Sequence, residues 1–232
     1  GNITLDACYC NRGSETLLIV LYHGYSADKT ALLSEAQRFL ELGASVLLVD
    51  FRGSGGSSES YTTIGVHEAE DVAAVTAYVR ANLNHSAMVL FGQSMGAVAI
   101  LRAVHVHGIE PDAVILEAVF DTLLKTVCNR FGSMGVPAFP AAHLLVFWGG
   151  RQWGFNGFKH RPVNYASSLK CPALFMHGTD DPRAELQDGR RVFKATPKPK
   201  TLIEFPDVGH EAYVSKYPTE WTAAVAQFMR GI

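Results

Sequence analysis

A serine between two glycines is the residue of this chain best suited to do chemistry. Residues 92–96 read Gly-Gln-Ser-Met-Gly and directly follow the apolar run 88–91. A serine hydroxyl can attack a carbonyl carbon when a neighbouring base removes its proton. The pattern predicts a strand, a sharp turn and a helix, with Ser94 raised on the turn as a nucleophile. The flanking glycines fit because such a turn leaves little room for side chains.

Two later segments offer a base and a carboxylate that could orient it. Asp180 and Asp181 follow the apolar run 173–176, and His210 follows the last such run, 201–205. Where a nucleophile stands on this kind of turn, the triad has the chain order serine, acid, histidine. Adjacent residues of an extended stretch point in opposite directions, so only one of the two aspartates can reach His210.

The elements that must position these residues alternate along the chain. Short apolar runs bounded by Gly or polar residues predict strands buried on both faces, and longer amphipathic stretches between them predict helices. The expected strands are 17–22, 45–51, 88–91, 113–116, 173–176 and 201–205. The expected helices are 30–42, 66–83, 94–107, 184–195 and 219–229. This alternation predicts an α/β fold with a mostly parallel, doubly wound sheet, helices on both faces, and an antiparallel edge strand within 3–10.

One segment breaks the alternation. Residues 121–165 lie between two expected strands and are rich in Gly, Pro and aromatic residues. Such a length far exceeds an ordinary connection of about 4–6 residues. We expect a helix plus a small cap over the mouth of the sheet, inserted in a single domain, 1–232. Its aromatics either pack the cap onto the domain or bind an apolar group. The second interpretation, which we favour, makes Phe147, Trp148 and Trp153 pocket residues.

Composition narrows the class of partner. The chain of 232 residues is 48% hydrophobic and 18% charged, with a formal net charge of -2 and no Lys/Arg-rich run. This is ordinary globular composition, and it favours neither nucleic acid nor an anionic membrane as a partner. No apolar run reaches the ~20 residues of a membrane-spanning helix. We favour a cytoplasmic location, with a leader or anchor before Gly1 left open. The oligomeric state is not indicated.

No metal or cofactor is expected. Cys8 and Cys10 are one residue apart, a spacing that in a strand disfavours a disulfide, and we expect small buried side chains there. The cysteines and histidines show no metal-ligand spacing. The Gly/Ser-rich stretch 50–57 lacks the pattern of a phosphate loop, so we expect a turn in which Arg52 is tied to nearby carboxylates.

Five motifs in this order resemble the α/β-hydrolases, in particular their serine-aminopeptidase-like, or lysophospholipase-like, branch. The resemblance begins near residue 16 and rests on His23-Gly24, residues 50–57, residues 93–96, the stretch 171–181, and Gly209-His210. It implies an α/β-hydrolase fold and a Ser-His-Asp triad. In that branch the acid stands three positions after the Gly of His-Gly, which selects Asp181 over Asp180. Some α/β-hydrolases carry the acid at the end of the preceding strand, so Glu117 remains an alternative, although we favour a supporting role for it.

The resemblance also assigns an oxyanion hole. The loop after His23 would contribute the backbone N–H of Tyr25, and the turn would contribute that of Met95. Two such donors stabilise the negative charge that develops on a substrate oxygen. His23 itself is expected to be a positioned structural residue beside the pocket, and Glu117 is a further candidate for the pocket wall.

These residues predict two-step acyl transfer on a small-molecule ester. Ser94 would attack with His210 as base, and Asp181 would hold the ring of the histidine. We favour a carboxylesterase. A serine aminopeptidase or amidase is the alternative, with Glu117 or Asp121 anchoring the amino group of the substrate. From a different class, a catalytically inactive binding protein on the same scaffold is a third hypothesis.

Overall fold

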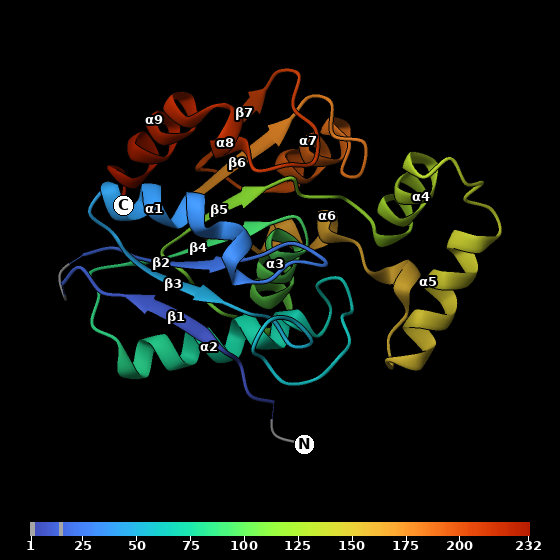
Figure 1. The fold of residues 1–232 in the computed structure, drawn as a ribbon, viewed down its shortest axis with the longest axis horizontal. Helices are drawn as coiled ribbons and strands as arrows, with labels where there is room; N and C mark the ends of the chain where they lie inside the picture. The colour runs from blue at the N-terminus through green and yellow to red at the C-terminus, as the bar shows by residue number, and fades with distance from the viewer. Residues whose placement is uncertain (1–2, 14–15) are drawn as a thin grey trace.

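The predicted apolar runs form the strands of a single sheet. A computed structural model describes residues 3–13 and 16–232 (Figure 1). The strands are β1 (Ala7–Cys10), β2 (Leu18–Tyr22), β3 (Ser45–Val49), β4 (Met88–Gln93), β5 (Ala113–Glu117), β6 (Ala173–Gly178) and β7 (Lys200–Phe205). Their order is β1-β3-β2-β4-β5-β6-β7, with β1 antiparallel to β3 and every other pairing parallel. The predicted α/β fold and its antiparallel edge strand are therefore confirmed.

Helices cover both faces of this sheet, as Figure 1 shows. They are α1 (Leu33–Glu41), α2 (Glu68–Asn82), α3 (Met95–His107), α4 (Leu123–Ser133), α5 (Ala141–Gln152), α6 (Pro162–Tyr165), α7 (Leu186–Ala195), α8 (Tyr213–Lys216) and α9 (Pro218–Met229). One core lies between the sheet and α2, α3 and α7, and a second lies between the sheet and α1 and α9. The protein is thus a doubly wound, three-layer structure.

Burial on both faces explains why the strands read as unbroken apolar runs. All five residues of β2 are buried, and successive side chains enter opposite cores. Leu18 and Val20 pack against α2 and α3, whereas Ile19 and Leu21 pack on the side of α1 and α9. A strand with one solvent-exposed face would instead alternate apolar and polar residues.

The edge strand β1 departs from one expectation. Cys8 and Cys10 are free, but Cys8 is exposed and Cys10 only half-buried. The prediction of buried side chains is therefore wrong for Cys8. The reason is that β1 pairs with β3 alone, so the helices that cover the central strands do not enclose it.

Most of the inserted segment 121–165 lies in a separate layer beyond the sheet. Its helices α4 and α5 pack on each other beyond the sheet, at the right of Figure 1, while the short helix α6 returns to pack beside α3. Helix α5 buries Ala142, Val146 and Gly150, which lie four residues apart and therefore share one face. We call α4, α5 and the residues joining them the cap.

A buried ion pair joins the loop after β3 to α2. The guanidinium of Arg52 contacts the carboxylate of Asp71 through Nη2 at 2.7 Å and Nε at 2.9 Å. Their side chains are only 4% and 2% exposed. Arg52 also reaches Glu70, which is half-exposed. The expectation that Arg52 is tied to nearby carboxylates is confirmed.

Removing Asp71 should be costly because it leaves the charge of Arg52 buried without its partner. We expect Asp71→Ala to lower the free energy of unfolding by about 3–5 kcal/mol. The matched variant Glu70→Ala, which removes the exposed partner of the same arginine, should cost no more than about 1 kcal/mol. Urea denaturation measures both values, and equal losses would contradict the assigned burial of the pair.

Candidate active site

Ser94 stands on a turn that only glycine neighbours permit. A Cβ on Gly92 would lie 2.5 Å from the nitrogen of Ala97, and one on Gly96 would lie 2.3 Å from the carbonyl oxygen of Tyr22. Between them Ser94 has φ 52° and ψ -108°, a strained conformation for a residue with a side chain. The sequence therefore builds a sharp strand-to-helix turn that raises the side chain of Ser94 above the end of β4.

The loops after β6 and β7 bring an acid and a base together. His210 Nδ1 lies 2.7 Å from Asp181 Oδ2. The other oxygen of Asp181 accepts the backbone N–H groups of Arg183 at 2.8 Å and Ala184 at 2.9 Å. These bonds fix the carboxylate, and the carboxylate holds the proton of a neutral His210 on Nδ1. The free ring nitrogen, Nε2, is then the basic one.

Backbone contacts hold the two loops in register. A Cβ on Gly178 would lie 2.4 Å from the carbonyl oxygen of Val208, so only glycine allows the loops to approach this closely. The backbone N–H of Asp180 donates to the same Val208 oxygen at 3.0 Å. The side chain of Asp180 is turned to solvent. Asp181, rather than Asp180, is therefore the aspartate that meets His210.

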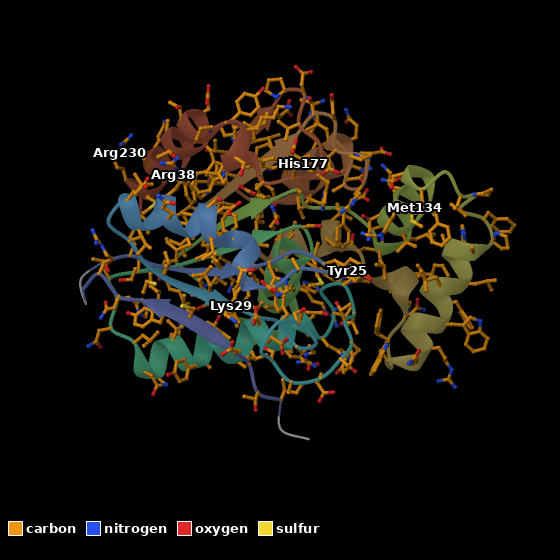
Figure 2. All side chains as sticks on the ribbon, viewed as in Figure 1. Tyr25, Lys29, Arg38, Met134, His177 and Arg230 are labelled. Carbon is orange, nitrogen blue, oxygen red and sulfur yellow. The ribbon has the colours of Figure 1, made fainter. Side chains whose placement is uncertain are left out.

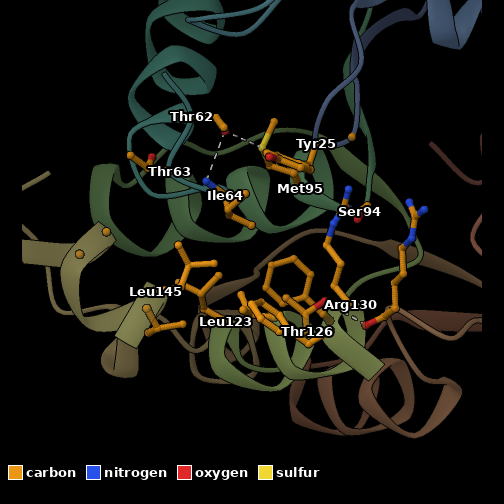
Figure 3. A pocket seen from close by; sticks show the side chains of 18 of the residues that line it. Tyr25, Thr62, Thr63, Ile64, Ser94, Met95, Leu123, Thr126, Arg130 and Leu145 are labelled. Atoms are coloured by element: carbon orange, nitrogen blue, oxygen red, sulfur yellow. Dashed lines mark hydrogen bonds between the residues drawn. The ribbon is translucent and has the colours of Figure 1, made fainter. Parts of the chain in front are cut away.

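Ser94 and His210 share a cavity of about 600 Å³ between the end of the sheet and the cap (Figure 3). In the described ranges 3–13 and 16–232, the Ser94 hydroxyl and the His210 ring form no hydrogen bond with each other. Much of the wall is apolar. It includes Phe120, Leu123, Phe131, Leu145, Trp153 and Phe155.

Tyr25 and Met95 line the same cavity. Met95 is the first residue of α3, so its backbone N–H has no acceptor within the helix and lies at the positive end of the helix dipole. The loop that carries Tyr25 approaches the turn closely, since a Cβ on Gly24 would lie 3.6 Å from Cβ of Ser94. This arrangement suits a pair of donors for an oxyanion.

His23 supports this loop from behind. Its Nε2 accepts the backbone N–H of Phe51 at 3.1 Å, and its Nδ1 lies 2.8 Å from the carbonyl oxygen of Gly24, to which it donates. Burial lowers the pKa of His23, so the ring stays neutral at neutral pH. The structural role expected for His23 agrees with this geometry.

One of the five side chains predicted to line the pocket lies in the wall of this cavity. Trp153 lines the cavity, but His23, Glu117, Phe147 and Trp148 do not. His23 and Glu117 are completely buried, whereas Phe147 and Trp148 are 48% and 63% exposed. Since α5 packs through its small residues, its two neighbouring aromatics face away from the cavity.

Two alternative carboxylates are engaged elsewhere. Oε1 of Glu117 accepts the indole N–H of Trp221 at 2.6 Å, and Asp121 accepts a hydrogen bond from Arg191 Nε at 2.6 Å. Neither residue lines the cavity. Glu117 therefore does not take the place of Asp181, and neither residue is placed to hold the amino group of a substrate beside Ser94.

Glu117 instead faces a second buried acid beneath the turn. Its backbone carbonyl accepts the N–H of Ser94 at 2.8 Å. Burial raises the pKa of its carboxyl well above the ordinary value, and the charge of Glu35 adds to this. Burial also raises the pKa of Glu35 to about 7. Because both Glu35 carboxyl oxygens are buried without a hydrogen-bond partner among the described residues, burial favours the protonated form of this carboxyl.

This pair should make stability depend on pH. The folded state holds the proton of the Glu35 carboxyl more tightly than the unfolded state does. Its contribution to the free energy of unfolding is therefore complete below the unfolded pKa of about 4.3 and is lost as pH rises through the folded pKa. The shift of Glu35 from 4.5 to about 7 corresponds to a loss of at most about 3 kcal/mol. The glutamine of Glu35→Gln cannot ionise. The free energy of unfolding of this variant minus that of wild type should therefore be larger at pH 8 than at pH 5, as measured by denaturant unfolding.

The exposed Glu41 on the same helix provides the control. Glu41→Gln should give the same difference from wild type at both pH values, because its lowered pKa puts its titration below this range. If the difference in unfolding free energy between Glu35→Gln and wild type changes with pH no more than the difference between Glu41→Gln and wild type, the buried acid pair is refuted.

Three parts of the cavity wall were not predicted from the sequence. They are Arg130 of α4, Arg183 beside the acid, and the loop 62–64. Buried Glu68 holds that loop by accepting the hydroxyl of Thr62 at 2.6 Å and the backbone N–H of Thr63 at 2.8 Å. Arg183 stands two residues after Asp181, so its place in the cavity wall could have been predicted from the sequence. The place of Arg130 in the wall depends on how α4 packs.

Within 3–13 and 16–232, no group of three or more His, Cys, Asp or Glu side chains is arranged to hold a metal ion. Among the helices of the same ranges, none is both long enough and apolar enough to cross a membrane.

The sheet order, the turn at Ser94 and the acid and base that follow define an α/β-hydrolase. Residues 31–232 match the sequence profile of the prolyl oligopeptidase family, and the chain belongs to that family. It is a serine hydrolase, and the resemblance to the serine-aminopeptidase-like branch is confirmed.

Similar proteins include both characterised and uncharacterised ones. The uncharacterised protein YqkD of Bacillus subtilis is 24% identical over 91% of this chain and 70% of its own length. Dipeptidyl aminopeptidase BIII of Pseudoxanthomonas mexicana is 26% identical over 83% of this chain and 30% of its own. The Pyrococcus furiosus esterase Pf2001 shares the fold with a TM-score of 0.81 and 22% identity, covering 99% of this chain and 87% of that one.

Proposed function

We propose that this serine hydrolase cleaves carboxylic esters through Ser94, His210 and Asp181. The proposal rests on how His210 and Ser94 are placed. His210 is bonded through Nδ1 to a fixed carboxylate, while the ring and Ser94 line one cavity. A base so oriented can activate a serine that is otherwise a poor nucleophile at neutral pH.

The proposed reaction is acyl transfer in two steps. The Ser94 side chain rotates toward His210, Nε2 takes the hydroxyl proton, and Oγ bonds to the carbonyl carbon of the ester. The resulting oxyanion accepts hydrogen bonds from the backbone N–H groups of Tyr25 and Met95. His210 then gives its proton to the departing alcohol, which leaves an acyl-enzyme. Water repeats the sequence, releases the carboxylic acid and restores Ser94.

A serine aminopeptidase is the second candidate, since the family profile and the dipeptidyl aminopeptidase relative point that way. An aminopeptidase needs an anionic group to hold the ammonium of its substrate. No Asp or Glu among the described residues lines the cavity, and the two carboxylates considered for this role are engaged elsewhere. The electrostatics of the cavity therefore favour an ester that lacks an ammonium group.

The nucleophile is tested by Ser94→Ala. We expect kcat/KM for p-nitrophenyl butyrate to fall by about 10³-fold or more, because triad residues act as a unit. The thermal unfolding midpoint should change little. Ser86→Ala, an exposed serine outside the cavity, should keep wild-type activity and labelling by a fluorophosphonate probe.

Three outcomes separate the hypotheses. Full activity in Ser94→Ala would refute the assigned nucleophile. A wild-type protein that neither turns over esters nor takes up the probe would support the inactive binding protein. Faster cleavage of an amino-acid p-nitroanilide than of p-nitrophenyl butyrate would support the aminopeptidase.

The acid is tested with the two adjacent aspartates. Asp181→Asn should lower kcat by about 10³–10⁴-fold, because the amide no longer selects the tautomer with a free Nε2. Asp180→Asn should stay within about threefold of wild type, as expected for a surface substitution. Ester kinetics of both variants decide the point, and a larger loss in Asp180→Asn would contradict the geometry.

A further inference from the structure

Two arginines lie in the wall of the cavity that holds Ser94. Arg130 comes from α4 of the cap, and Arg183 comes from the loop that carries Asp181. Figure 3 shows Arg130 extending from α4 toward Tyr25 and Ser94. Two cations beside the reacting serine, contributed by separate segments, are not used by the proposed triad.

Neither arginine is neutralised by the protein. Across residues 3–13 and 16–232, no carboxylate forms an ion pair with Arg130 or Arg183. Lys125, near the start of the same helix, provides a contrast. Its ammonium pairs with Glu185 at 2.9 Å and Asp188 at 2.5 Å. The helix thus has acidic partners within reach at its first turn but none at Arg130.

Two carboxylates that hold segments of the cavity wall are already occupied. Asp181 accepts hydrogen bonds from His210 and from two backbone N–H groups. Glu68 accepts from the loop 62–64 and from the N–H of Gly65. The positive charges of the two arginines are therefore left for a ligand.

Contacts within the protein position the guanidinium of Arg130 and the backbone of Arg183. The guanidinium carbon of Arg130 lies 5.1 Å from the ring centroid of Tyr25, a cation–π contact that holds it beside the proposed oxyanion hole. The carbonyl oxygen of Arg183 accepts the hydroxyl of Thr126 at 2.9 Å and the amide of Asn129 at 3.2 Å. Since these residues share a face of α4 with Arg130, the contacts place the backbone of Arg183 at the same rim of the cavity as Arg130.

We propose that Arg130 and Arg183 bind a carboxylate of the substrate, so that the preferred esters carry an anionic group. The inference rests on the proposed ester hydrolysis at Ser94 and adds a substrate class to it. A guanidinium presents a planar set of donors that matches a carboxylate. The apolar wall accommodates the carbon chain that joins this carboxylate to the ester. An ammonium group at the same place would be repelled.

The carboxylate can stand on the acyl side or on the alcohol side of the ester, and two matched pairs of substrates distinguish these. On the acyl side, p-nitrophenyl hydrogen glutarate is compared with p-nitrophenyl pentanoate, which has a methyl group where the glutarate has the carboxylate. On the alcohol side, 4-(butyryloxy)benzoate is compared with 4-(butyryloxy)benzamide. We expect kcat/KM for the anionic member of one pair to exceed that of its neutral partner at least tenfold, chiefly through KM.

Substitutions then assign the preference to the two arginines. Arg130→Gln and Arg183→Gln should each lower the ratio of anionic to neutral kcat/KM by about tenfold, and Arg130→Glu should bring it below one. The matched control is Arg151→Gln, which removes the same charge from an exposed position of α5 that does not line the cavity. It should leave the ratio and the neutral activity as in wild type.

The result that overturns the inference differs from the one that overturns the proposed function. A wild-type ratio near or below one in both pairs refutes the carboxylate site, even if the neutral esters are hydrolysed well. The same holds if Arg151→Gln changes the ratio as much as Arg130→Gln. Hydrolysis of none of the four esters refutes the proposed function. Competition provides a test that needs only the wild-type enzyme. Glutarate should inhibit the turnover of a neutral ester more strongly than glutaramide does.

Discussion

The first turn of α3 lies so close to the end of β2 that residue 96 must be glycine, and the site depends on this contact. With Gly96 against the carbonyl of Tyr22, the chain can leave β4 and enter α3 only through the strained turn at Ser94. The same approach places the N–H of Met95 beside the loop of Tyr25. One backbone contact thus shapes both the turn that carries Ser94 and the neighbouring loop that carries Tyr25.

Burial and hydrogen bonding separate the histidine at the site from those that hold the fold. His160 is buried, its Nε2 lies 3.0 Å from the carbonyl oxygen of Ile64, and burial lowers its pKa to about 4. His177 is buried against the carbonyl of Ala184, and burial lowers its pKa as well. His210, in contrast, is only partly buried, has a carboxylate on Nδ1 and lines the cavity. Its surroundings leave one ring nitrogen available for proton transfer.

The sheet and the turn that carries Ser94 could be predicted from the sequence because each depends on local patterns, whereas the choice of Asp181 over Asp180 came from the resemblance to a family. Strands such as β2 are buried on both faces, so they read as continuous apolar runs. The pocket wall was less predictable, since it depends on the rotation of α5. That helix packs through Ala142, Val146 and Gly150 and turns Phe147 and Trp148 outward, against the usual rule that the largest apolar residues are buried. Likewise, Arg130 could not be placed without the packing of α4.

The most direct test of the account is to identify the atom that carries the acyl group during turnover. The enzyme would be mixed with excess p-nitrophenyl butyrate, quenched in acid within milliseconds, digested with protease and sequenced by tandem mass spectrometry. If Ser94 is the nucleophile, a butyryl group is expected on the peptide that contains residues 92–96, attached to Ser94. A butyryl group on another residue, or continued turnover with no acylated peptide and no burst of p-nitrophenol, would contradict this assignment.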